Sequence, residues 1–189
     1  MIAVIDETTI ESGKGFIYVI ASVAIIEDAT LARTTLARVT RGRERPFHWV
    51  KEGPEARRRM VTAVDQLGAV AVGFQQGCGR RGQDKTRSIL LAEALVWAVG
   101  EGADGVIVES RGRKLDVQDK RVVKQLRSTG HAIPGVQWDT KRNPLLWLAD
   151  SVCGAHRERH NQEVMGGVAS PEATDLILAA NLEVNYVQK

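Results

Sequence analysis

The chain has 189 residues, 43% of them hydrophobic and 26% charged, with a formal net charge of +3 and a sequence pI of about 9.0. These values are typical of a globular chain with a sizeable core and exclude an intrinsically disordered one. No apolar run reaches the roughly 20 residues of a membrane helix, so no membrane association is expected. The first residues lack a basic segment and reach Asp6 too early for a signal peptide, and two cysteines indicate a reducing compartment. We therefore expect a cytoplasmic protein.

Short apolar runs alternate along the chain with segments of helical spacing. Strands are predicted over residues 2–6, 16–26, 69–74, 105–109 and 133–138. Helices are predicted over residues 28–39, 54–67, 86–100, 117–127, 144–156 and 170–181. The first two strands should form an antiparallel hairpin around Lys14. The later strands alternate with helices, which predicts an α/β fold whose mixed sheet also contains parallel strands and has helices on both faces.

One domain boundary is expected near the C-terminus. Gly166 and Gly167 interrupt the chain before the last predicted helix. We therefore expect one domain over residues 1–165 and a C-terminal helical appendage over residues 166–189.

Three acidic residues lie in unusually apolar surroundings. Asp6 ends the first predicted strand, Glu109 ends the predicted strand over residues 105–109, and Asp150 is the only charge between Leu145 and Ala155. Burying a lone carboxylate costs several kcal/mol unless it is paired or binds a metal. The carboxyl ends of parallel strands are where open α/β sheets place their sites. A shared divalent cation, Mg²⁺ or Mn²⁺, would explain all three, and independent ion pairs with arginines are the alternative.

Several short motifs resemble those of one protein family. They are Val4-Ile-Asp-Glu7, Phe47-His48 before a helix, and Leu145-Leu-Trp-Leu-Ala-Asp150. The family they resemble is known as domain of unknown function 3800, has the RNase H-like fold, and reads Asp-Glu-Ser-Gly near its start and Leu-Gln-Leu-Ala-Asp near its end. The resemblance extends to about His160, with departures at Thr8-Thr9 and at Trp147.

The resemblance implies that residues 1–165 form an RNase H-like domain with Asp6, Glu109 and Asp150 in the metal-binding positions and with Glu7 and His48 in lesser ones. The expected activity is a nuclease that hydrolyses phosphodiester bonds with two cations about 3.5–4 Å apart. Asp6 would bridge the cations, and Glu109 and Asp150 would complete one site each. His48 would either shuttle a proton or be a hydrogen-bonded histidine with no part in catalysis.

Basic residues are concentrated in three segments; the first covers residues 33–59, and its densest run is from Arg41 to Arg59. The other two cover residues 80–87 and 111–127. They are either solvated helix faces or a surface that follows phosphates. On the second interpretation the partner is DNA or RNA, and the run from Arg41 to Arg59 borders the acidic site. The four tryptophans are expected in the core, and among them Trp49 is the candidate to be exposed and to stack on a base. Homo-oligomerisation is left open.

Three alternatives compete with the nuclease. The domain could be a catalytically silent RNase H-like module that binds nucleic acid or regulates. Gly77-Cys-Gly-Arg-Arg-Gly82 matches the dinucleotide fingerprint of an oxidoreductase, although Phe74-Gln-Gln separates it from the preceding strand. His156 and His160 have the spacing of a zinc-binding pair, but they are expected at a helix end, where histidines complement the helix dipole.

Overall fold

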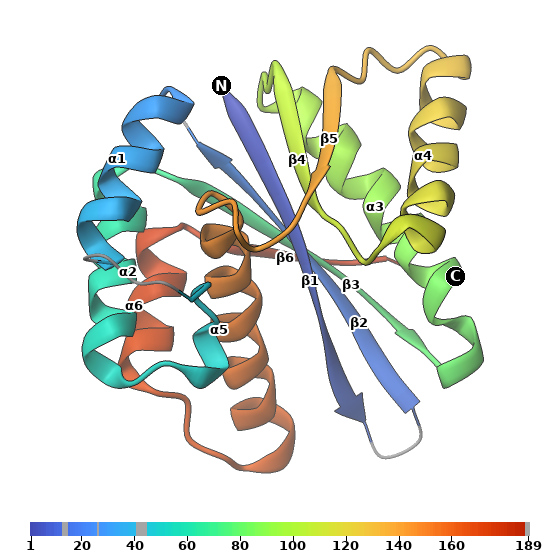
Figure 1. Ribbon diagram of the computed structural model, residues 1–189. Helices are drawn as coiled ribbons and strands as arrows, with labels where there is room; N and C mark the ends of the chain where they lie inside the picture. Colours follow the sequence, from blue (N-terminus) through green and yellow to red (C-terminus); the bar gives the residue numbers. More distant parts are fainter. Residues whose placement is uncertain (13–14, 26, 41–44, 188–189) are drawn as a thin grey trace.

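The computed structural model describes residues 1–12, 15–25, 27–40 and 45–187. The expected turn at Lys14, the last residue of the second predicted strand and most of the basic loop before Pro46 lie outside these ranges. The described residues form one mixed sheet with helices on both faces, as predicted (Figure 1).

The sheet has six strands in the order β5-β4-β1-β2-β3-β6. The strands are β1 (Ile2–Ser12), β2 (Gly15–Ile25), β3 (Val70–Cys78), β4 (Gly105–Glu109), β5 (Gly135–Asp139) and β6 (Glu183–Tyr186). β1, β2 and β3 form an antiparallel meander, whereas β4 pairs parallel with β1 and β5, and β6 pairs parallel with β3. This is the predicted combination of a hairpin and parallel strands.

The helices divide between the two faces of the sheet. They are α1 (Ala29–Thr40), α2 (Pro54–Gln66), α3 (Gln83–Gly100), α4 (Arg113–Ser128), α5 (Leu146–Met165) and α6 (Pro171–Ala179), with short 3₁₀ turns at Trp49–Lys51 and Arg80–Gly82. α3 and α4 cover one face, and α5 lies against the other with α1, α2 and α6 outside it (Figure 1). Among the described residues, no helix is long and apolar enough to cross a membrane.

Alternation along β1 and β4 assigns each side chain to a face. Val4 and Ile107 belong to the core under α5, whereas Ala3, Ile5 and Val108 belong to the core under α3. Because successive strand residues point to opposite faces, the residues that follow at even spacing from Val4 and Ile107 face α5. The carboxylates of Asp6 and Glu109, two residues after Val4 and Ile107, therefore both point to the α5 face of the sheet.

β1 is longer than predicted. Its polar residues after Asp6 continue as a strand because β2 pairs with them up to Ser12. Its parallel pairing with β4, however, ends at Ile5, opposite Val108. Asp6 therefore lies inside a strand, but at the point where β4 stops.

The segment after Gly166 packs on the same sheet. α6 lies against α5 and α2, and β6 adds a strand to β3 that the sequence analysis does not predict. β6 is short and mostly exposed, so it lacks the apolar pattern of a buried strand. The division of the chain at residue 165 stays a prediction.

Candidate functional site

The three predicted acids come together on the α5 face of the sheet. Asp6 lies on β1, Glu109 is the last residue of β4, and Asp150 lies in the second turn of α5. Asp6 is buried, and the side chains of Asp150 and Glu109 are only 13% and 22% exposed. Their convergence follows from strand alternation and from the helix that crosses the strand ends. Their role as metal ligands stays a prediction.

A lysine ammonium lies among the three carboxylates. Lys141 Nζ is 3.1 Å from Asp6 Oδ2 and 3.5 Å from Glu109 Oε1, and it also contacts Asp150 Oδ1. Lys141 belongs to the loop between β5 and α5, and the indole of Trp147 donates a 2.8 Å hydrogen bond to its carbonyl oxygen. The cluster of three acids and one lysine leaves an excess of negative charge when all are ionised.

The electrostatics of the cluster follow from burial and from this excess charge. Burial raises the pKa of Asp6 well above its usual value, and neighbouring Glu109 raises it further, whereas Lys141 lowers it. Burial also raises the pKa of Asp150, against the opposing effect of Lys141. For Lys141, burial would lower the pKa, but the charges of Asp6 and Asp150 outweigh it and raise the pKa. Asp6 and Asp150 are thus costly to ionise, and a nearby cation compensates them.

Asp150 is oriented by the segment that contains His48. The backbone N–H of Trp49 donates a 2.7 Å hydrogen bond to Asp150 Oδ2, and His48 Nδ1 lies 3.6 Å from Asp150 Oδ1. The His48 side chain is one-third exposed, so it connects the cluster with solvent. Sequence reasoning placed His48 as a candidate, and the structure places it beside one of the three acids.

Trp49 is buried, as expected of a core tryptophan, and the alternative that it is exposed and stacks on a base is wrong. Its indole N–H donates a 2.9 Å hydrogen bond to Glu158, and the Arg57 guanidinium lies 4.9 Å from its ring centre. The ring packs against the backbone of Gly154, where an added Cβ would fall 2.5 Å from Trp49. This packing anchors the residues that hold Asp150.

Glu7 takes part in a second network on the opposite face of β1. Its carboxylate contacts the Arg87 guanidinium and accepts a 2.6 Å hydrogen bond from Tyr18 Oη. Arg87 also pairs with Asp119 of α4 at 2.8 Å, and Arg111 lies 3.4 Å from Glu7. Burial raises the pKa of Tyr18. These residues connect β1 with α3 and α4 behind the acidic cluster.

The basic segment around residues 45–59 divides into two parts. The arginines of α2 pair with acids of the protein itself: Arg57 with Glu158, Arg58 with Glu172 and Arg59 with Glu55. Arg45 and Lys51 are exposed and flank His48 in the sequence. The described part of the segment therefore reaches the acidic cluster through His48 and Trp49, while much of the α2 charge is already neutralised.

The glycine segment lacks the geometry of a dinucleotide site. Gly77 lies within β3, and the strand that follows α3, β4, pairs with β1 and not with β3, so β3, α3 and β4 do not form a unit of two adjacent parallel strands. The backbones of Gly79 and Gly82 have φ values of −84° and −94°, which other residues also adopt. The oxidoreductase alternative therefore loses its structural support.

The expectation that His156 and His160 lie at a helix end is wrong, because α5 continues to Met165, and both side chains are buried. His156 Nε2 lies 2.9 Å from Gln75 Oε1, and neither His156 Nδ1 nor His160 Nε2 has a hydrogen-bond partner among the described residues. Burial, then His160 and Arg159, lower the pKa of His156 to about 4. His156 is therefore a neutral core histidine at pH 7.

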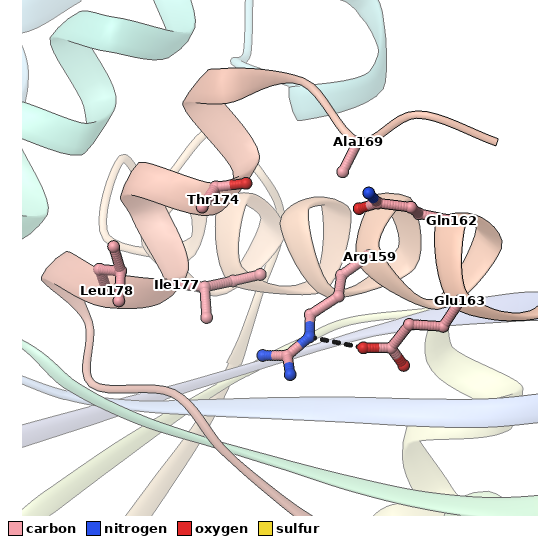
Figure 2. A pocket seen from close by; sticks show the side chains of 7 residues that line it. All are labelled: Arg159, Gln162, Glu163, Ala169, Thr174, Ile177 and Leu178. Carbon is pink, nitrogen blue, oxygen red and sulfur yellow. Dashed lines mark hydrogen bonds and ion pairs between the residues drawn. The ribbon is translucent and has the colours of Figure 1, made fainter. Parts of the chain in front are cut away.

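A pocket of about 480 Å³ lies between the second half of α5 and α6. Figure 2 shows the Arg159–Glu163 ion pair on one side of it and Ile177 and Leu178 on the other. None of its lining residues belongs to the acidic cluster, and its ion pair is satisfied at 2.8 Å. We assign it no catalytic function.

Lys141 and Arg87 are the important residues that sequence reasoning missed. Lys141 lies in a loop with no periodic pattern. The sequence indicates its position only because the loop follows the end of β5 and precedes α5, which carries Asp150. The sequence places Arg87 in a basic group that is predicted to be either solvated or phosphate-binding. Apolar Leu90 and Leu91 follow Arg87 at i+3 and i+4 on the same face of a core helix, which is the signal that Arg87 is buried.

Among solved structures, the chain is similar to RNase HII of Archaeoglobus fulgidus, determined in complex with PCNA. The two are 17% identical over 94% of this chain and 87% of that chain, with a TM-score of 0.52. At this identity the likeness shows the fold, which is RNase H-like. No protein-family model matches the chain, and no curated protein matches it.

Within the described residues, no group of three or more His, Cys, Asp or Glu side chains is arranged as a preformed metal site. In the acidic cluster the Lys141 ammonium lies where the carboxylates point. The donor set nevertheless fits a hard divalent cation, because it consists of carboxylate oxygens and the buried Asp6 Oδ2 already faces a cationic group, the Lys141 ammonium.

Proposed function

We propose that this chain is a divalent-metal-dependent nuclease, with Asp6, Glu109 and Asp150 as ligands for Mg²⁺ or Mn²⁺. The observation that carries the proposal is the convergence of three carboxylates from two central strands and a crossing helix. Their position, where β4 ends beside β1, is a usual place for sites in α/β sheets. The similarity to an RNase supports the reaction class.

The protein's own groups prepare the site. The N–H of Glu7 donates a 2.7 Å hydrogen bond to Asp6 Oδ1, and that of Trp49 donates one to Asp150 Oδ2. Each bond fixes one carboxylate and leaves its other oxygen toward the centre. When bound there, a cation would lower the pKa of a coordinated water and stabilise the leaving oxygen. His48, between Asp150 and solvent, is placed to carry a proton in or out.

The test is a cleavage assay on end-labelled single-stranded and double-stranded DNA, RNA and RNA–DNA hybrid. We expect products with Mg²⁺ or Mn²⁺, none with EDTA, and loss of activity by at least about 100-fold in Asp6→Asn. His48→Ala should lower the rate by a factor of about 10² and leave metal binding intact. Cleavage that survives EDTA or Asp6→Asn would contradict the proposed site.

Lys141 favours a second candidate, a catalytically silent RNase H-like module that binds nucleic acid. An ammonium that stays among the three carboxylates offsets part of their charge, so the fold would not need a metal. If the chain is such a module, we expect EDTA to leave nucleic-acid binding unchanged and no added metal to produce cleavage. The same panel of substrates therefore separates the two functions.

A further inference from the structure

The position of Lys141 is incompatible with a metal bound by the same carboxylates. Its ammonium lies 3.1 Å from Asp6 Oδ2 and 3.5 Å from Glu109 Oε1, and it contacts Asp150 Oδ1. Mg²⁺ requires oxygen ligands at about 2.1 Å, so it would need the same space. The Lys141 side chain is only 14% exposed, so it fills the interior of the cluster rather than its rim.

The Lys141 backbone is held by hydrogen bonds of its loop, whereas the ammonium at the end of the side chain is held by ion pairs with the carboxylates. The indole N–H of Trp147 donates to the Lys141 carbonyl at 2.8 Å, and the loop is closed by an Asn143 N–H bond to Thr140 O and by the Asn143 amide on Asp139. These bonds fix the loop against β5 and α5. The four-carbon side chain of lysine rotates about its single bonds, so the ammonium can leave the cluster without a change in the loop backbone.

We propose that Lys141 is a built-in counter-cation that a divalent metal displaces, and that the displaced ammonium then binds a phosphate of the nucleic acid. This inference rests on the proposed nuclease function. Without metal, the ammonium neutralises carboxylates that would otherwise repel one another. With metal, the same ammonium is released at the site, where a phosphodiester supplies its next partner.

Exchange of this kind couples the two ligands. Metal releases the cation that phosphate needs, and phosphate keeps that cation away from the carboxylates. Because coupling between two binding sites is reciprocal, each ligand should strengthen the binding of the other. A lysine that only stabilises the fold would give no such coupling.

The experiment compares the full chain with Lys141→Met, which keeps the stem and removes the charge, and with Lys124→Met as a control at an exposed position on α4. Mn²⁺ affinity is measured by electron paramagnetic resonance and calorimetry. We expect Lys141→Met to bind Mn²⁺ at least about tenfold more tightly than wild type, because no cation has to leave. Lys124→Met should match wild type.

Nucleic-acid binding is the second measurement, made with Ca²⁺ and a phosphorothioate-protected strand so that cleavage does not interfere. Ca²⁺ should strengthen binding by wild type and by Lys124→Met several-fold, whereas Lys141→Met should lose this enhancement. If Lys141→Met does not fold, wild type labelled with ¹³C at the lysine ε carbon answers the question by NMR. One buried lysine signal should then move to the position of exposed lysines when Mg²⁺ is added.

The outcomes distinguish this inference from the proposed function. Equal Mn²⁺ affinity in wild type and Lys141→Met, or Mg²⁺ binding with an unmoved lysine signal, would overturn the exchange and leave the metal site intact. Binding of Mn²⁺ by Lys141→Met alone would mean that the lysine blocks the site, which also overturns the exchange. Absence of binding in every protein would contradict the metal site itself.

Discussion

The substitution Asp150→Asn tests whether Asp150 is a metal ligand or a structural ion-pair partner. In Asp150→Asn the remaining amide oxygen can still accept the bond from Trp49, and Lys141 keeps its contacts with Asp6 and Glu109. Burial makes the Asp150 charge costly. Its raised pKa means that this cost appears as pH rises above the unfolded value. We therefore expect the variant to melt at an equal or higher temperature than metal-free wild type at pH 7.

The same variant should lose its response to metal. At 100 times its dissociation constant, Mn²⁺ stabilises wild type by about 2.7 kcal/mol, and this gain should vanish in Asp150→Asn. Asp175→Asn, at an exposed position on α6, is the matched control and should behave as wild type. Differential scanning calorimetry measures all three proteins. A loss of about 3–5 kcal/mol in Asp150→Asn, with no effect of Mn²⁺ on wild type, would identify Asp150 as a salt-bridge partner of Lys141.

His156 should make the protein acid-sensitive. Its pKa is about 4 in the folded protein, below the usual 6.5, so the unfolded chain takes up a proton first as pH falls. Folding stability is therefore complete above pH 6.5 and is lost as pH falls toward 4. Between pH 7 and pH 5 the loss should be about 2 kcal/mol. Urea denaturation of wild type and His156→Gln at both pH values measures it.

The control for His156 is the exposed His131, and His131→Gln should keep the wild-type dependence on pH. His156→Gln retains an amide that can bond to Gln75, so it tests the titration rather than the loss of a contact. If wild type and His156→Gln lose stability equally between pH 7 and pH 5, the acid sensitivity arises elsewhere.

At the scale of elements, α5 joins the core to the site through Trp49. A Cβ on Gly154 would fall 2.5 Å from the Trp49 ring, so Gly154→Ala must displace the indole. We expect a loss of about 1–3 kcal/mol on urea denaturation, despite the better helix propensity of alanine. The displaced segment should also hold Asp150 less well, which should weaken the stabilisation by Mn²⁺.

Gly100→Ala is the control for this prediction, because nothing lies within 4 Å of a Cβ added at the end of α3. It should be neutral or slightly stabilising. If Gly154→Ala and Gly100→Ala are equally stable, Trp49 adapts easily and the packing on α5 does not position the site.

Elements with a regular apolar period could be predicted, and elements shaped by polar contacts could not. The apolar spacing predicts most of α3, from residue 86 on, but not its polar first turn, which begins at Gln83. α5 was expected to end near His156, yet it continues to Met165. Its last turns are rich in charged residues, and their helical structure depends on pairs such as Arg159–Glu163 that no apolar pattern reveals.

At the scale of the whole molecule, topology made the acidic cluster predictable in part. Two carboxylates at the ends of neighbouring strands, and a third in an otherwise apolar helix, could be placed together from general rules of α/β sheets. The direction of the Lys141 side chain could not be predicted, because a loop residue has no periodicity and its position depends on tertiary contacts. The same limit applies to Arg87, whose partners Glu7 and Asp119 are distant in the sequence.

The charge distribution gives a last prediction about nucleic-acid binding. Arg45 and Lys51 are exposed and flank His48 in the sequence, which lies beside the acidic cluster, whereas Arg57, Arg58 and Arg59 pair with the protein's own acids. We therefore expect Arg45→Gln combined with Lys51→Gln to weaken binding of any sequence. The slope of log affinity against log salt concentration should fall by about two, because each phosphate contact contributes about one.

Fluorescence anisotropy with labelled DNA and RNA between about 50 and 200 mM salt measures this slope. Arg33→Gln on α1 removes one charge outside the segment and should leave the slope unchanged. An affinity that does not depend on salt would contradict a phosphate-binding surface altogether. A slope that falls equally in Arg33→Gln would mean that the net charge of the molecule attracts the nucleic acid, and that the residues around His48 do not form a specific path for the backbone.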